Sequence, residues 1–287
     1  MKKLIINADD LGADEGRNAG ILEAVRAGVV KSVSLLPNGP ATAEAIEAIH
    51  DGKYEGVSIG PHLNLSEGKS ISGGLRLLAG DNGALPGKTA AQRLLLQEDN
   101  PELEKEVFRE VEAQIGLLRK AGISLSHIDG HQHLHIFPAA RKAVIGAARK
   151  HGISWIRLAH EPYPVSEEER IPEDLESEAK RFSELSAGAF PLLAGTGIRA
   201  ADRFCGLYLK GRLSSDILER YLAGFPEGLT ELMVHPGRIP VEAGASPFGG
   251  FSTIEREKEL AALLSPSFHK AVLQNGVSLI SFREALP

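Results

Sequence analysis

The stretch Ile123-Ser-Leu-Ser-His-Ile-Asp-Gly-His-Gln-His-Leu-His135 joins a predicted β-strand to a cluster of histidines. The apolar residues at its start predict a strand over 123–128, and four of the ten histidines of the chain lie within 127–135. Imidazole is the most common metal ligand in proteins, and its unperturbed pKa lies near neutrality. The cluster, which includes Asp129, therefore predicts a metal or acid–base site at a strand end. The simpler explanation is a solvated histidine-rich loop or a few hydrogen-bonded core histidines, and the pattern along the rest of the chain bears on this choice.

Short apolar runs alternate with helical patterns on both sides of this stretch. Further strands are predicted at 4–6, 32–36, 57–59, 155–158, 229–234 and 277–281. Helices are predicted between them at 18–27, 41–50, 101–121, 138–151, 214–222 and 253–264. The clearest is the helix at 101–121, because Asn100 is a good N-cap, Pro101 suits the first helical position and Gly122 suits the position after the last turn.

The alternation of strands and helices predicts an α/β fold with a mainly parallel sheet and the helices outside it. Short apolar strands are typical of a sheet that is buried on both faces. About seven such units in 287 residues favour a closed or partly open (β/α) barrel, and a doubly wound open sheet is the alternative. We expect a single domain over 1–287 with two irregular parts. The Gly/Ser-rich segment 66–88 is either a lid over a site or a plain surface loop, and 160–200 is a variable, glutamate-rich excursion.

The composition is that of an ordinary soluble globular protein, with 43% hydrophobic and 24% charged residues. A formal net charge of −6, without any run of Lys or Arg, argues against a nucleic-acid partner. The lone Cys205 excludes an intramolecular disulfide and a cysteine-based zinc site. The N-terminal apolar run is too short for a signal peptide, and no apolar stretch is long enough to span a bilayer. We therefore expect a cytoplasmic protein with no membrane partner.

Polar residues follow several of the predicted strands. The carboxyl ends of parallel strands lie together and form the active site in α/β folds, so these residues are expected to meet in space. That convergence is a stronger signal than any single motif. In chain order, the residues are Asp9 and Asp10, His62 and Asn64, Asp129 and His131, Arg157, and His235.

The pair Asp9-Asp10 carries the chemical argument, because two adjacent carboxylates are costly to bury unless a cation, a donor or water meets them. If one of them coordinates a metal, the other can remain free as a base. Two histidines and one carboxylate leave coordination positions open, as a catalytic metal needs. Each motif also has a simpler explanation: a helix N-cap for the aspartates, a hydrogen-bonded core residue for His62, and a turn for His235-Pro236-Gly237.

Four blocks in this order resemble the YdjC-like carbohydrate deacetylases. They are Asn7-Ala-Asp-Asp-Leu-Gly12, Gly60-Pro-His-Leu-Asn-Leu65, His127-Ile-Asp-Gly-His-Gln-His-Leu-His135 and Glu231-Leu-Met-Val-His-Pro-Gly237. The stretch Glu255-Arg-Glu-Lys-Glu-Leu260 also resembles a segment that follows the last block in that family. The resemblance covers residues 4–281 and fits 160–200 less well. It implies a distorted (β/α) barrel, similar to that of the NodB-type deacetylases.

The resemblance also implies roles for the strand-end residues. One divalent metal ion, Mg²⁺ or Zn²⁺, is expected on Asp10, His62 and His131, with Asp9 as general base and His235 as general acid. Leu11 and Gly130 stand where the family often has Phe and Ser, and neither is a proposed ligand. Asn64, Asp129, His133, His135 and Arg157 are tentative sugar or acetate contacts. Asp129 is also a candidate to orient a ligand histidine, and His133 and His135 could equally pack the strand end.

The implied activity is a metal-dependent hydrolysis that removes N-acetyl groups from amino sugars or short chitooligosaccharides and releases acetate. A small carbohydrate is the implied partner, and a homodimer is compatible because family members are often dimers. Two alternatives stay open: another metal-dependent amide or ester hydrolase, and a sugar-binding barrel without catalysis. The scarcity of basic residues near the motifs argues against a phosphate ester. The presence of both Asp9 and Asp10 argues against a protein that only binds.

Overall fold

The computed structural model describes residues 1–164, 171–239 and 247–285. Within these ranges one parallel sheet runs in the order β5-β4-β3-β2-β1-β7-β6, and β8 also pairs with β1. Its strands are β1 (Lys2–Leu11), β2 (Ser32–Leu35), β3 (Ser58–Leu63), β4 (His127–Gly130), β5 (Trp155–Ile156), β6 (Arg203–Cys205), β7 (Gly228–Val234) and β8 (Val277–Leu279).

β1 pairs with three other strands, and its last eight residues are buried. Leu4, Ile5 and Ile6 are at most 1% exposed, which shows that this strand is covered on both faces. A run of β-branched and leucine side chains without polar alternation is the expected sequence for such a position. Its paired register with β7 runs from Lys2–Gly228 to Ala8–Val234, so the last block of the resemblance lies beside the first.

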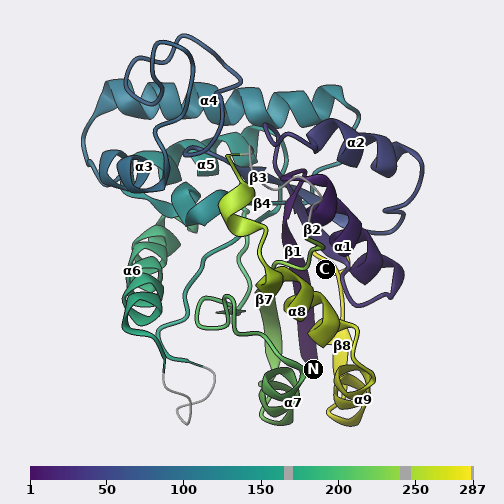
Figure 1. Ribbon diagram of the computed structural model, residues 1–287. Helices are drawn as coiled ribbons and strands as arrows, with labels where there is room; N and C mark the ends of the chain where they lie inside the picture. The colour runs from purple at the N-terminus through teal and green to yellow at the C-terminus, as the bar shows by residue number, and fades with distance from the viewer. Residues whose placement is uncertain (165–170, 240–246, 286–287) are drawn as a thin grey trace.

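The helices and short 3-10 segments lie between and around the strands. Figure 1 shows α4 beside α5, and α7 beside α9 near the N-terminus of β1. The helices are α1 (Glu15–Arg26), α2 (Thr42–His50), α3 (Lys88–Leu95), α4 (Pro101–Lys120), α5 (Pro138–Lys150), α6 (Glu173–Ala189), α7 (Ser215–Ala223), α8 (Ile254–Leu263) and α9 (Pro266–Gln274), with the 3-10 segments η1 (His131–Ile136), η2 (Phe190–Leu193) and η3 (Gly249–Phe251).

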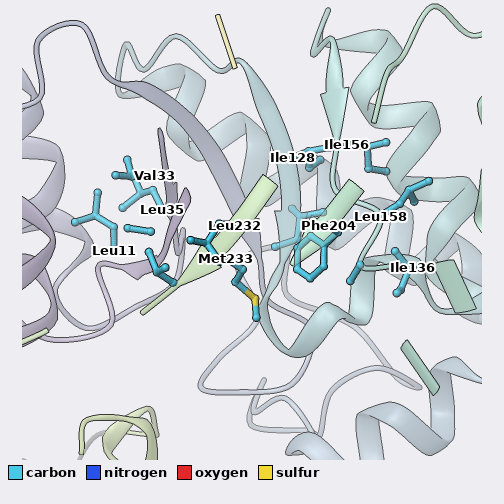
Figure 2. Packing of buried hydrophobic residues seen from close by; sticks show 14 of the residues in the cluster. Leu11, Val33, Leu35, Ile128, Ile136, Ile156, Leu158, Phe204, Leu232 and Met233 are labelled. Carbon is cyan, nitrogen blue, oxygen red and sulfur yellow. The ribbon is translucent and has the colours of Figure 1, made fainter. Parts of the chain in front are cut away.

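The sheet curls until its two edge strands approach each other. β5 meets the segment before β6 through an isolated bridge between Trp155 and Arg199, in which the Ile156 amide donates to the Arg199 carbonyl at 2.8 Å. Ile156 of β5 and Phe204 of β6 belong to one core cluster, which Figure 2 shows from close by. The fold is therefore the expected distorted barrel of parallel strands, and the alternative of an open doubly wound sheet is wrong.

Several predicted boundaries differ from the structure. The strand expected at 123–128 is β4, which begins at His127, and Leu125 forms only an isolated bridge with Ile59. β3 pairs with β4 at His62–Asp129 and Leu63–Gly130, so the regular pairing of these two strands lies next to the histidine cluster. β6, α3 and α9 were not predicted.

The two irregular segments have definite positions. The 66–88 segment lies against α4, where Glu106 and Glu110 accept hydrogen bonds from backbone amides between Ile71 and Leu78. The 160–200 excursion contains α6 and η2, and its residues 165–170 lie outside the described ranges. Among the described helices, none combines the length and the apolar character that a membrane crossing requires.

Candidate metal and active site

A bulge in β1 turns both adjacent aspartates toward the same cavity. Successive side chains of a regular strand point to opposite faces. Between Ala8 and Leu11 the register with β2 shifts by one residue, and Asp10 has a φ of +67°. Aspartate tolerates this left-handed conformation better than most residues. The extra residue of the bulge lets Asp9 and Asp10 both line the cavity at the end of β1.

Asp10, His62 and His131 form a compact set of potential metal ligands. A carboxylate oxygen of Asp10 lies 2.8 Å from His131 Nδ1 and 3.3 Å from His62 Nε2, and the three ligand atoms lie within 4.8 Å of one another. One carboxylate and two imidazoles suit a divalent ion such as Zn²⁺ and leave coordination positions open. The donor set thus fits the metal that the sequence resemblance implies.

A second set, Asp9, His62 and Asp129, has equally close ligand atoms. Here the guanidinium of Arg157 already lies between the two carboxylates, 2.7 Å from Asp9 and 2.9 Å from Asp129. Because a cationic side chain occupies that position, the first set suits a metal ion better than the second.

Asp129 fixes the orientation of the His62 ring through Nδ1, the ring nitrogen that does not face Asp10. Its Oδ1 lies 2.8 Å from His62 Nδ1, while its other oxygen accepts a 2.6 Å hydrogen bond from Ser34 Oγ. A carboxylate on the far nitrogen fixes the ring of a metal-binding histidine and makes it a better ligand. Burial opposes a charge on His62, but the carboxylates of Asp129 and Asp9 raise its pKa to about 10.

Arg157 binds three buried carboxylates at once. It is 1% exposed, forms two hydrogen bonds with Asp9, and contacts Asp129 and Glu231. Burial raises the pKa of Asp9, and the charge of Arg157 opposes that rise. Arg157 therefore holds the Asp9 carboxylate in place at the cavity wall, next to Asp10 of the candidate metal set.

Asp10 has its own cationic partner on α1. Arg17 Nη1 lies 2.7 Å from Asp10 Oδ2, and both side chains are almost fully buried. Burial by itself would raise the pKa of Asp10, but His131, His62 and Arg17 hold it well below its usual range. Asp10 is therefore an ionised carboxylate, as a metal ligand must be.

His235 faces the aspartates from the end of β7. Its backbone amide donates to Glu259 Oε2 at 2.6 Å, and its ring Nδ1 lies 3.9 Å from the same oxygen. Burial and the nearby Arg256 hold the pKa of His235 well below its usual range. The ring is therefore neutral at rest, and it has to take up a proton before it can donate one.

The histidine cluster forms the short helix η1 with a strained turn inside it. Gln132 and His133 have φ angles of +54° and +56°, a conformation that is uncommon outside glycine. The turn sends the three rings of η1 to different places. His131 lies at the metal set, His133 packs edge-to-face on Phe182, and His135 lies 3.0 Å from the Arg157 carbonyl.

These side chains surround a cavity of about 400 Å³ at the carboxyl end of the sheet. Six predicted residues line it: Asp9, Asp10, His62, His131, His133 and His235.

Four residues predicted as substrate contacts do not line this cavity: Asn64, Asp129, His135 and Arg157. Each is at most 1% exposed, and each already has partners within the protein. Asn64, for instance, exchanges hydrogen bonds with Gln114, Asn38 and the loop at 66–67. For these four the structure replaces the expected sugar contact with a position behind the cavity wall.

Other lining residues were not predicted from the sequence. They come from helices and loops rather than strand ends, and include Lys88, Glu178, Phe182, Leu207, Lys210 and Arg256. Glu178 of α6 joins two of them, 2.6 Å from Lys88 Nζ and 3.1 Å from Lys210 Nζ. Of these six residues, Arg256 lies in a quoted motif, the stretch 255–260, and the other five lie outside the quoted motifs.

The sequence pattern of YdjC-like proteins matches residues 3–274. The chain belongs to the YdjC-like family. A YdjC-like relative in Listeria monocytogenes, named carbohydrate deacetylase, is 39% identical over 293 residues, covering 98% of this chain and 99% of its own. Human carbohydrate deacetylase is 33% identical over 298 residues, with 96% and 89% covered. These matches confirm the resemblance inferred from the four blocks.

A solved structure also supports the YdjC-like barrel. A candidate cellobiose-phosphate cleavage protein from Enterococcus faecalis superposes with a TM-score of 0.77 and 25% identity, covering all of this chain and 99% of its own. The similarity extends over the entire barrel, in agreement with the curled parallel sheet.

Proposed function

We propose that this YdjC-like protein is a metal-dependent hydrolase that removes N-acetyl groups from amino sugars or short chitooligosaccharides. The observation that carries the proposal is the pair of adjacent carboxylates in one cavity, of which Asp10 joins two histidines and Asp9 binds Arg157 instead. The relatives in Listeria and human, named carbohydrate deacetylases, support a sugar as substrate.

Asp10, His62 and His131 would hold one divalent ion, Mg²⁺ or Zn²⁺. When bound, the ion would supply a Lewis acid for the acetamide carbonyl. Asp9 is the general base that takes a proton from the attacking water, and Arg157 keeps its carboxylate directed at the cavity.

His235 is the proposed general acid. An amide nitrogen is too basic to leave as an anion, so a proton has to reach it as the C–N bond breaks. The low pKa of His235 makes the ring neutral at rest, so we propose that the proton that Asp9 takes from the attacking water passes through the His235 ring to the leaving amine. Acetate and a free amino sugar are the products.

The residues behind the wall have positioning roles in this proposal. Asp129 fixes His62, and Arg157 fixes Asp9. His133 remains the proposed sugar contact among the predicted ones, since it lines the cavity with its ring packed on Phe182. The protein is proposed to act in the cytoplasm as a monomer or homodimer on a small carbohydrate.

The test is release of acetate from N-acetylglucosamine and N,N′-diacetylchitobiose by protein loaded with Zn²⁺ or Mg²⁺ and by chelated protein. Release that requires the metal supports the proposal. Hydrolysis of other amides or esters only, with both sugars untouched, would instead support a different metal hydrolase. Binding of the sugars by metal-loaded protein without any acetate would support a sugar-binding barrel.

A further inference from the structure

The seam between the two edge strands is closed at its cavity end by a side chain. β5 and β6 are the ends of the strand order, and in the described residues they are joined by the single bridge between Trp155 and Arg199, which precedes β6. Edge strands leave backbone N–H groups without ladder partners. At the carboxyl end of β6 the amides of Gly206 and Leu207 would be such groups.

Glu161, four residues after Arg157, accepts both of these hydrogen bonds. Its Oε2 lies 3.0 Å from the Gly206 nitrogen and 2.7 Å from the Leu207 nitrogen. The side chain is 4% exposed and does not line the cavity, so it is not available to a substrate. Both N–H groups are buried, and a buried N–H without an acceptor costs free energy, so one side-chain oxygen meets the need of both. Glu161 therefore takes the place of a strand pairing between the two edges.

The same residue is anchored to α6. The Glu161 amide donates to Ser183 Oγ at 2.9 Å, and the neighbouring His160 ring contacts the Ser183 carbonyl at 3.1 Å. The next residue of α6 toward its start, Phe182, lines the cavity. Glu161 thus joins its own segment after β5 to two parts of the cavity wall, the segment after β6 and α6.

The segment that Glu161 holds has little freedom to lie elsewhere. Gly206 has a φ of +137°, and a Cβ at this position would lie 2.8 Å from the Met233 carbonyl oxygen. The chain therefore passes tightly against β7 at Gly206, and the next residue, Leu207, enters the cavity wall beside Met233. Without the two hydrogen bonds to Glu161, the turn at Gly206 and Leu207 would still contact β7 on one side but would lose its contact with the segment after β5 on the other.

We propose that Glu161 is a positioning residue, which closes the seam between β5 and β6 and so sets the place of Leu207 on the wall of the substrate cavity. The inference rests on the proposed deacetylase function for its effect on turnover, but not for its effect on the seam. Glu161 determines how the sugar fits, and it leaves the metal ligands, which come from β1, β3 and η1, unaffected.

The test compares Glu161→Ala with Glu161→Gln. The alanine variant removes the acceptor, whereas the glutamine carbonyl can still accept both N–H groups. Amide hydrogen exchange at 206–207, bound metal, and kcat and KM for N,N′-diacetylchitobiose are measured on each. For Glu161→Ala we expect exchange to be faster by about tenfold. We also expect KM to rise by about tenfold, with kcat and metal content nearly unchanged. Glu161→Gln is expected to restore both values.

Glu106→Ala is the matched control. Glu106 is also a glutamate that accepts backbone amides, those of Arg76, Leu77 and Leu78, but it lies on α4 and does not line the cavity. This variant is expected to speed exchange at 76–78 and to leave KM unchanged. If Glu161→Ala does not fold, Glu161→Asp serves in its place, since its shorter side chain cannot reach both amides.

Two results would overturn the inference: unchanged exchange at 206–207 in Glu161→Ala, or faster exchange with an unchanged KM. A KM as high in Glu161→Gln as in Glu161→Ala would also contradict the inference, because the loss of the hydrogen-bond acceptor would then not explain the rise in KM. Hydrogen exchange does not depend on turnover. Wild-type protein that releases no acetate would therefore contradict the proposed function, while the exchange data still decide whether Glu161 closes the seam.

Discussion

Asp10 shows how a single backbone angle creates the candidate site. Its φ of +67° places it in a conformation that costs a non-glycine residue free energy, of order 1–3 kcal/mol. Without that angle and the bulge around it, Asp9 and Asp10 would lie on opposite faces of β1. The strain is offset by the ion pair with Arg17 and the contact with His131.

Arg157 is the side chain whose removal should cost most. In Arg157→Met, the carboxylates of Asp9, Asp129 and Glu231 lose their shared cation while they remain buried. Breaking a buried ion pair from one side costs about 3–5 kcal/mol. We expect a loss of this size in the free energy of unfolding, measured by urea denaturation.

Arg238→Met is the matched control for that experiment. Arg238 also binds one carboxylate, that of Glu23, through three hydrogen bonds, but both side chains are nearly half exposed. Exposed ion pairs contribute about 0–1 kcal/mol. Equal losses in the two variants would show that the burial of Arg157 does not matter.

Glu161 should make stability depend on pH. Burial raises the pKa of Glu161 from an ordinary value of 4.5 to about 7, although the hydrogen bonds from the Leu207 and Gly206 amides act to lower it. Because the folded state holds this proton more tightly, the stabilisation is complete below pH 4.5 and is lost as the pH rises through 7. Relative to Glu161→Gln, wild-type protein should lose up to about 3 kcal/mol of unfolding free energy between pH 4.5 and pH 8. A difference that is constant over this range would contradict the raised pKa.

At the residue scale the sequence predicted which strand-end groups gather but not which of them face the cavity. Asp9, Asp10, His62, His131 and His235 meet, because parallel strands bring their carboxyl ends together. The inward or outward direction of each side chain depends on the β1 bulge and on the turn inside η1. Neither follows from an apolar pattern, so the wall positions of Asn64, His135 and Arg157 could not be foreseen.

Among the elements, α4 supports the cavity from outside. Gln114 of α4 accepts from the Asn64 amide and donates to the Asn64 carbonyl, two residues after His62, a proposed metal ligand. One turn earlier, Glu110 accepts from Gln114 and from the Ile71 and Ser72 amides. The 66–88 segment is thereby attached to the same helix face that holds the end of β3.

Glu110→Ala should loosen this segment. It leaves the amides of Ile71 and Ser72 and the amide group of Gln114 without their acceptor at a fully buried position. The penalty for unsatisfied buried donors is about 1–3 kcal/mol. We expect a loss of that size in thermal or urea unfolding and faster hydrogen exchange at 71–72. Glu112→Ala, on the surface side of the same helix beside Lys150, should change stability little, and an equal effect of both variants would refute the role of Glu110.

Elements with a strong local signal were predicted well, and those defined by packing were not. α4 begins and ends as its N-cap and C-terminal glycine indicate, with Asn100 Oδ1 accepting from the Leu103 amide. β6 has three residues and exists through its pairing with β7, and α3 follows directly on an irregular segment. Such elements depend on tertiary contacts, which no window of the sequence contains.

The molecule as a whole is a curled sheet that is nearly a closed barrel. Its strand order leaves β5 and β6 as edges, and contacts at Arg199 and Glu161 bridge them. The alternation of strands and helices predicted this architecture, and the YdjC-like relatives confirm it. The seam was not predictable, since strand order around a barrel is set by pairings between residues far apart in the chain.

The central claim is that two residues adjacent in sequence have different roles, Asp9 as the general base and Asp10 as a metal ligand. The most direct test is acetate release from N,N′-diacetylchitobiose by Asp9→Asn, with bound metal measured in the same sample. We predict that the variant keeps its metal and loses acetate release by about a hundredfold or more, as expected when a general base is removed. Acetate release at the wild-type rate by metal-loaded Asp9→Asn would contradict the account.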